Sequence, residues 1–170
     1  TRFTSNESNE QLEKISQEVA TGSFSRSGPE REQSWGDSWA AVRDKFQNSN
    51  YDLTVLDPPY VSANHIVRWM GQYVRAESPN FEMEVYRYIR ESVFRKLMKD
   101  AIAVHDVGAG SCFNSVAYLQ YNPKARVFAY DWAEASQDIA YMLWLKYDMR
   151  IYGHYVDFYD CNITLDPLDI

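Results

Sequence analysis

The chain has 170 residues, 45% of them hydrophobic, which is enough for one domain with a substantial core. Its formal net charge of −7 repels phosphate backbones, so binding bare DNA or RNA would require a local basic patch. The best such cluster falls on the polar side of one expected helix, beside acidic side chains, and comprises Arg87, Arg90, Arg95, Lys96 and Lys99. We interpret it as a solvated helix face and expect no nucleic-acid partner.

Membrane and metal-binding classes are also disfavoured. The sequence has no run of about 18 apolar residues and no signal peptide, so we expect no membrane partner and, by default, a cytoplasmic location. Cys112 and Cys161 lie far apart, and the three histidines lack ligand spacing, so no metal site is predicted.

The N-terminal part of the chain divides by composition. Residues 1–34 are polar and too poor in apolar side chains to support a core, so we expect a flexible tail with a short helix at 11–19. Residues 35–99 are expected to form a helical cap module. Its first helix is predicted over 35–46, with Asp37 or Ser38 as its N-cap.

Two more helices are predicted in this module. Apolar residues recur at helical spacing over 64–74 and again over 81–98. The second of these helices carries a ladder at Val85, Ile89, Val93 and Leu97, which we expect to pack against a sheet.

Residues 100–170 alternate between strand and helix patterns. Strands are predicted near 101–107, 126–130 and 151–156, with helices at 111–120 and 135–147. This βαβαβ order predicts an α/β fold with a Rossmann-like parallel sheet, truncated after about three strands and preceded by the helical cap.

The first strand passes into its helix through a glycine turn. Asp106 is followed by Gly108-Ala109-Gly110, where glycines let the backbone approach a ligand and the helix N-terminus offers free N–H groups. A dinucleotide fingerprint needs a small third residue, but Phe113 stands there and would hold the helix off the strand. An acid two residues ahead of the turn suits a ligand that carries an amine, as S-adenosylmethionine does. The turn therefore disfavours NAD.

The next two strands also end in acids. Asp131 follows the second strand, 23 residues after Gly108, where a carboxylate can accept hydrogen bonds from ribose hydroxyls. Trp132 is placed to pack against either an adenine or the core. Asp157 and Phe158 end the third strand, where an acid and an aromatic ring could hold the adenine amine and face.

These motifs, DVGAGS at 106–111, YD at 130–131 and VDFYD at 156–160, resemble those of class I S-adenosylmethionine-dependent methyltransferases. The resemblance covers roughly residues 100 to 160. It implies S-adenosylmethionine as methyl donor and in-line transfer from its sulfonium to an acceptor. By analogy with enzymes that carry a helical cap, it implies a small-molecule O or N acceptor, such as a sugar. No catalytic base is assigned.

The end of the sequence affects this interpretation. Residues 167–170 read like the opening of a fourth strand, and three parallel strands alone would leave an unpaired edge. We therefore expect either a fragment of a longer protein or an oligomer in which a partner completes the sheet.

Three other functions stay open. The first is a non-catalytic Rossmann-like module that binds an adenosine ligand or a protein. The second is an adenine amino-methyltransferase, because Asp57-Pro58-Pro59-Tyr60 matches that class's DPPY motif. An ordinary turn is the favoured reading, since residues 61–99 offer no strands for the permuted order this motif would need. The third, a nicotinamide-dependent oxidoreductase, is weakened by Phe113 and Asp106.

Overall fold

The computed structural model describes residues 4–22, 32–58, 66–78 and 80–157. The chain forms two compact units, of which the first comprises Thr1–Arg31 and Pro59–Glu91 and the second Glu32–Pro58 and Ser92–Ile170. These boundaries interleave and differ from the expected breaks after residues 34 and 99. Within the described ranges, no helix is long and apolar enough to cross a membrane.

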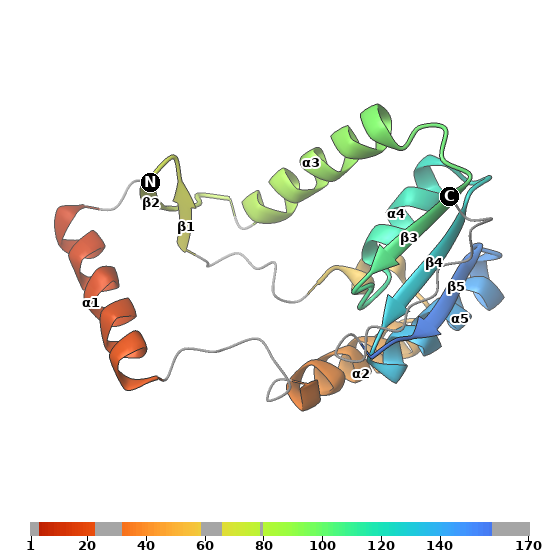
Figure 1. Ribbon diagram of the computed structural model, residues 1–170, viewed down its shortest axis with the longest axis horizontal. Coiled ribbons are helices and arrows are strands. Elements are labelled where there is room, and N and C mark those ends of the chain that lie inside the picture. Colours follow the sequence, from red (N-terminus) through yellow and green to blue (C-terminus); the bar gives the residue numbers. More distant parts are fainter. Residues whose placement is uncertain (1–3, 23–31, 59–65, 79, 158–170) are drawn as a thin grey trace. The chain divides into compact units, whose positions relative to one another are not determined.

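The second unit contains the predicted parallel sheet. Its strands are β3 (Ala103–Val107), β4 (Arg126–Asp131) and β5 (Ile151–Tyr155), hydrogen-bonded in the order β3-β4-β5 (Figure 1). Both pairs are parallel, with Ala103 opposite Arg126 and Val127 opposite Ile151. The α/β, Rossmann-like prediction is confirmed by this topology.

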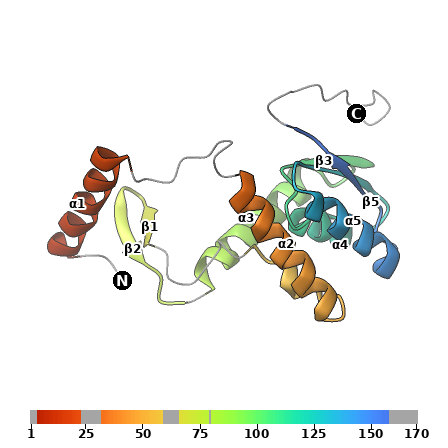
Figure 2. The same ribbon diagram turned by 90° about the horizontal axis from the view of Figure 1, so that it is seen from below.

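Two helices connect these strands. α4 (Phe113–Tyr121) and α5 (Glu134–Tyr147) cover the same face of the sheet, as right-handed crossovers between successive parallel strands require (Figures 1 and 2). Ile139 and Leu143 of α5 are fully buried in the core under β4 and β5. A Cβ on Gly153 would lie 3.1 Å from the backbone of Gln137, so this glycine lets α5 approach β5 closely.

The opposite face of the sheet carries stacked rings. His105 lies between Phe128 and Tyr130, and its Nδ1 is 3.0 Å from the Tyr130 hydroxyl. Phe128 stacks on Tyr152, and Tyr130 stacks on His154. These rings lie on alternate residues of neighbouring strands, which places them on one face.

α2 (Glu32–Asn48) belongs to the same unit as the sheet. It lies along α5 (Figure 2) and buries Trp39, Val42 and Phe46. Its Arg43 is 3.0 Å from Asp138 of α5. The predicted helix is confirmed, but the N-cap prediction is wrong.

The reason is that α2 begins earlier than its apolar spacing indicates. Asp37 and Ser38 therefore lie inside the helix and bond to the preceding turn. The Asp37 carboxylate accepts from the Gln33 amide, and the Ser38 hydroxyl donates to the Ser34 carbonyl.

α3 (Phe81–Leu97) confirms the predicted helix, but the side of it that packs is different. Val93 and Leu97 of the expected ladder are 38% and 80% exposed. Phe94 is buried instead, with its ring edge-on to Tyr118 of α4 at 5.1 Å. Aromatic contacts of Phe94 with Tyr118 and Tyr121 of α4 thus orient this end of α3.

Two predictions for the first unit are wrong. Residues predicted to form a tail with a short helix form α1 (Ser5–Thr21), a helix of 17 residues. Its start is fixed by Thr4 and Glu7, which bond reciprocally as a capping box, and Gly22 ends it with a left-handed φ of 66°. Local capping thus supports a longer helix than the sparse apolar residues indicate.

The second correction concerns the helix predicted over 64–74. Residues there form an antiparallel hairpin of β1 (Ile66–Trp69) and β2 (Gln72–Arg75), so the cap module is not all helical. Met70 and Gly71 make the two-residue turn, both with positive φ. Isoleucine, valine, tryptophan and tyrosine all favour strands, and over so short a run their spacing fits either structure.

The Tyr118 hydroxyl generates a stability prediction. This side chain is 1% exposed and donates to the Met98 carbonyl at 2.7 Å, which ties α4 to the end of α3. Tyr118→Phe should lower the free energy of unfolding by about 0.5–1.5 kcal/mol, because it removes this hydrogen bond while the Met98 carbonyl still accepts from the Ala101 N–H at 3.1 Å. Chemical denaturation measures the loss, and Tyr121→Phe, on a ring that is 40% exposed, should stay within about 0.5 kcal/mol. Equal effects in the two variants would contradict the assignment.

Candidate functional site

The glycine turn after β3 is held against the end of β4. Gly108 and Gly110 have φ angles of 74° and 51°, in the region that favours glycine. The N–H groups of Gly108 and Ala109 both donate to the Tyr130 carbonyl, at 2.9 and 3.0 Å. The turn is therefore fixed by the last residues of the neighbouring strand.

Asp131 closes the same turn with its side chain. Its Oδ2 accepts from the Gly110 N–H at 2.8 Å, and its Oδ1 accepts from the Ala133 N–H at 2.9 Å. The residue is 3% exposed. Each carboxylate oxygen keeps lone-pair capacity for a further donor, but ribose hydroxyls would reach it only if a neighbouring group moved.

Asp106 lies at the carboxyl end of β3 and faces α4. The Ser115 hydroxyl donates to its Oδ2 at 2.6 Å. Burial raises the pKa of the Asp106 carboxyl, and the nearby charge of Asp131 raises it further, against the opposing effect of Ser115. A cationic group beside this carboxylate would offset its desolvation.

Trp39 of α2 covers the turn. A Cβ placed on Gly110 would lie 2.6 to 3.0 Å from three atoms of the Trp39 indole. Ser111, the next residue, donates its hydroxyl to the Leu56 carbonyl at 2.7 Å. Sequence analysis missed Trp39, because nothing in its local pattern links it to a turn 71 residues away.

The hydrogen bond from Ser111 to the Leu56 carbonyl lies next to the DPPY sequence, which begins at Asp57. Leu56 ends a 3-10 helix, η2 (Leu53–Leu56), so Asp57 and Pro58 follow a turn and not a strand. Pro59 and Tyr60 lie outside the described residues. This local structure agrees with the ordinary-turn interpretation.

The remaining predicted site residues follow the other two strands. Trp132 is partly buried and packs against the core. Asp157 is exposed just beyond β5, and the preceding Val156 N–H donates to the Asp131 carbonyl at 3.0 Å. Phe158 lies outside the described residues. The structure thus brings Asp106, the glycine turn and Asp131 together, with Trp132 and Asp157 at the same edge of the sheet.

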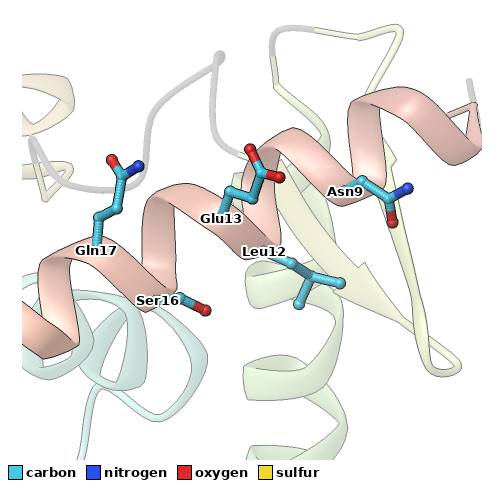
Figure 3. A pocket seen from close by; sticks show the side chains of 5 residues that line it. All are labelled: Asn9, Leu12, Glu13, Ser16 and Gln17. Carbon is cyan, nitrogen blue, oxygen red and sulfur yellow. The ribbon is translucent and has the colours of Figure 1, made fainter.

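Within the described part of the chain, hollows also lie away from this turn. One of about 630 Å³ runs between α5 and the edge strand β5, lined in part by Tyr141, Trp144 and Tyr152. Another of about 410 Å³ lies along α1, where Figure 3 shows Asn9, Leu12, Glu13, Ser16 and Gln17. Among the residues that the structure covers, no group of three or more His, Cys, Asp or Glu side chains could hold a metal ion.

Solved structures similar to this chain include the following two. Coclaurine N-methyltransferase, bound to N-methylheliamine and SAH, is 13% identical with a TM-score of 0.45, over 86% of this chain and 45% of that one. The [4+2]-cyclase SpnF is 19% identical with a TM-score of 0.41, over 68% and 43%. The chain thus spans less than half the length of either. No family model and no curated protein matches it, and similarity this low assigns no reaction.

Replacing the two glycines of the turn tests its packing. Gly110→Ala places a methyl group inside the Trp39 ring contact and strains the backbone, whereas Gly108→Ala meets nothing within 4 Å and adds strain alone. We expect Gly108→Ala to cost about 1–2 kcal/mol of unfolding free energy and Gly110→Ala at least about 1 kcal/mol more. Chemical denaturation of both variants measures the difference, and a smaller loss in Gly110→Ala would exclude the Trp39 contact.

The raised pKa of Asp106 predicts a pH dependence of stability. A carboxyl whose folded-state pKa lies above its ordinary value near 3.8 contributes stability that is present below that value. That contribution is lost as the pH rises through the folded-state pKa. Asp106→Asn removes this titration while keeping an oxygen to accept from Ser115. The variant should therefore be more stable than wild type at pH 7, and the margin should shrink toward pH 4.

Thermal unfolding of both proteins across this pH range measures the margin. Asp100→Asn, an exposed acid in the α3–β3 loop, is the matched control and should show no such margin. A margin that grows on acidification would mean that Asp106 is stabilised in its charged form.

Proposed function

We propose that the chain binds S-adenosylmethionine at the carboxyl edge of its sheet. We further propose that it is part of a methyltransferase that acts on a small-molecule acceptor. The observation that carries the proposal is the bond from the Gly110 N–H to the Asp131 carboxylate. It joins the turn after one strand to the acid that ends the next, and in an open α/β sheet this edge is where ligands bind.

The three acids would take different parts of the ligand. Asp106 would orient the ammonium of the methionine part, which supplies the cation that its partly buried carboxylate lacks in the described contacts. Asp131 would accept from the ribose hydroxyls through its remaining lone pairs once a neighbouring group moves aside, and Asp157 with Phe158 would hold the adenine. Trp132 would pack beside the base. When bound, the donor supplies an activated methyl group on its sulfonium.

The chain's own contribution to transfer would be positioning. Holding an acceptor in line with the methyl group can supply much of the rate without a metal or a covalent nucleophile. The acceptor would be a small molecule with an O or N nucleophile. The burial of Asp131 favours one other candidate, a non-catalytic Rossmann-like module whose turn stays closed to ligands.

Calorimetric titration separates these candidates. Wild-type protein should bind S-adenosylmethionine and S-adenosylhomocysteine saturably and should not bind NAD. Asp106→Asn should weaken both S-adenosyl ligands about tenfold or more, because a hydrogen bond to a charged group contributes about 1.5–3 kcal/mol. Asp100→Asn, which removes an equivalent charge on a loop at the opposite end of β3, should leave both affinities unchanged.

Three other outcomes of the titrations would contradict parts of this proposal. A folded wild-type protein that binds none of the three ligands would support the non-catalytic module. Saturable NAD binding would instead restore the oxidoreductase reading. Equal weakening in Asp106→Asn and Asp100→Asn would mean a general effect of charge and no contact with the ammonium.

A further inference from the structure

β5 is an edge strand that lacks the usual protection against pairing with another chain. Within the described residues, the sheet order β3-β4-β5 leaves one side of β5 without a neighbouring strand (Figure 1). Edge strands are commonly protected by charged side chains, by proline or by a bulge. The five residues of β5, IYGHY, include no proline and no Lys, Arg, Asp or Glu. The strand is therefore able to accept a further strand.

Alternate residues of β5 direct their backbone groups away from β4. Bonds to β4 are made by the Arg150 carbonyl and by the Val156 N–H, so the even-numbered residues of this segment face β4. The backbone groups of Ile151, Gly153 and Tyr155 consequently point to the open side. Gly153 is the middle residue of these three and of the strand.

A hollow of about 630 Å³ lies along the same edge, between β5 and α5. Its lining includes Ile151 and the rings of Tyr141 and Trp144, which are 59% and 46% exposed. Tyr155 is 60% exposed and, two strand positions beyond Gly153, lies on the same face of the sheet as Ile151. Aromatic side chains are enriched in protein–protein interfaces, so the edge and the hollow together form a surface suited to a protein partner.

Antiparallel pairing of two copies of β5 about Gly153 would use all of these features. Gly153 of each copy would exchange backbone hydrogen bonds with Gly153 of the other, and Ile151 would lie opposite the second copy's Tyr155. Residues opposite each other in a sheet share one face, so that Tyr155 ring lies on the α5 side, beside the hollow. Each copy therefore presents a ring where the other has a hollow.

The charges at the two ends of β5 favour this antiparallel direction. Arg150 precedes the strand and Asp157 follows it, and both are exposed. With Gly153 at the centre, Arg150 of one copy lies one position away from Asp157 of the other, whereas parallel pairing would bring like charges together. The Arg150 guanidinium donates to the Lys124 carbonyl, a neutral acceptor, so this contact does not compensate its charge.

We propose that two copies of this chain pair through β5, antiparallel about Gly153, with Tyr155 of each copy in the hollow between α5 and β5 of the other. The pairing joins the two parallel sheets into one continuous sheet, with α5 of both copies on the same face. A second copy fits because the surface is self-complementary, as an interface on a two-fold axis requires. The inference is independent of the proposed function.

Sedimentation of the full chain in the analytical ultracentrifuge tests the association. The wild-type protein should form a concentration-dependent dimer. Tyr155→Glu should raise the dissociation constant at least about thirtyfold, because it places a carboxylate among ring faces and beside Asp138, which also lines the hollow. Tyr88→Glu, the same change on a 76% exposed ring of α3, should leave the dissociation constant unchanged.

Cysteine cross-linking tests the register. Tyr152 of one copy would lie opposite His154 of the other, in a pair without backbone hydrogen bonds and with Cα atoms about 4.5 Å apart, within the range of a disulfide. Under mild oxidation, a mixture of Tyr152→Cys and His154→Cys proteins should therefore form cross-linked dimers. Either variant alone should not, because its own two cysteines would lie about 7–8 Å apart. Both variants carry Cys161→Ser, and Cys112 is fully buried.

The other outcomes overturn the proposal. A wild-type protein that stays monomeric at every concentration would mean that this edge does not accept a second copy, whatever else binds there. A dimer that Tyr155→Glu leaves intact, or a cysteine mixture that does not cross-link, would mean that the copies meet elsewhere or in another register. Circular dichroism verifies that each variant is folded, and if Tyr155→Glu is not, the cross-linking result decides alone. Neither measurement uses a ligand, so a failure of the proposed function does not affect this test.

Discussion

The bond between the Gly110 N–H and the Asp131 carboxylate is the interaction on which the rest of the site depends. The connection from β3 to α4 has positive φ at three residues, Gly108, Gly110 and Cys112, and such a turn is poorly defined by its own sequence. Asp131 and the Tyr130 carbonyl together accept three of its N–H groups. Because these acceptors end β4, the shape of the turn follows from the register of the parallel sheet.

The position of α2 depends on its contacts with α5 and with the glycine turn. α2 meets α5 through the Arg43–Asp138 pair and meets the turn through Trp39. The Ser111 hydroxyl holds η2 to the start of α4 through the Leu56 carbonyl. Residues 32–58 therefore belong to the same compact unit as the sheet. In the sequence, about 45 residues, including the hairpin, separate them from β3.

The sequence predicted the sheet well because each strand there is short, apolar and followed by an acid or a turn. The same reasoning placed Asp106, the glycine turn and Asp131 at the ends of neighbouring strands, where the structure has them, and their role in binding stays a prediction. It failed over residues 64–74, where spacing fits both structures and the Met70-Gly71 turn decides for a hairpin. It also missed Trp39, since a contact over 71 residues depends on how α2 packs, which no local pattern encodes. The hydrogen bonds from the Gly110 and Ala133 N–H groups to the Asp131 carboxylate could not be predicted either, because they depend on the register of the sheet.

The electrostatics of the turn bear on the choice of ligand. Two carboxylates share this edge, and the charge of Asp131 is one cause of the raised pKa of Asp106. A pyrophosphate placed at the same helix N-terminus would add like charge to a partly desolvated acidic pair, and the N–H of Gly110 already serves Asp131. A ligand with an ammonium and a sulfonium instead supplies positive charge where burial has made negative charge costly. The same two acids that disfavour a dinucleotide therefore favour a ligand that carries positive charge.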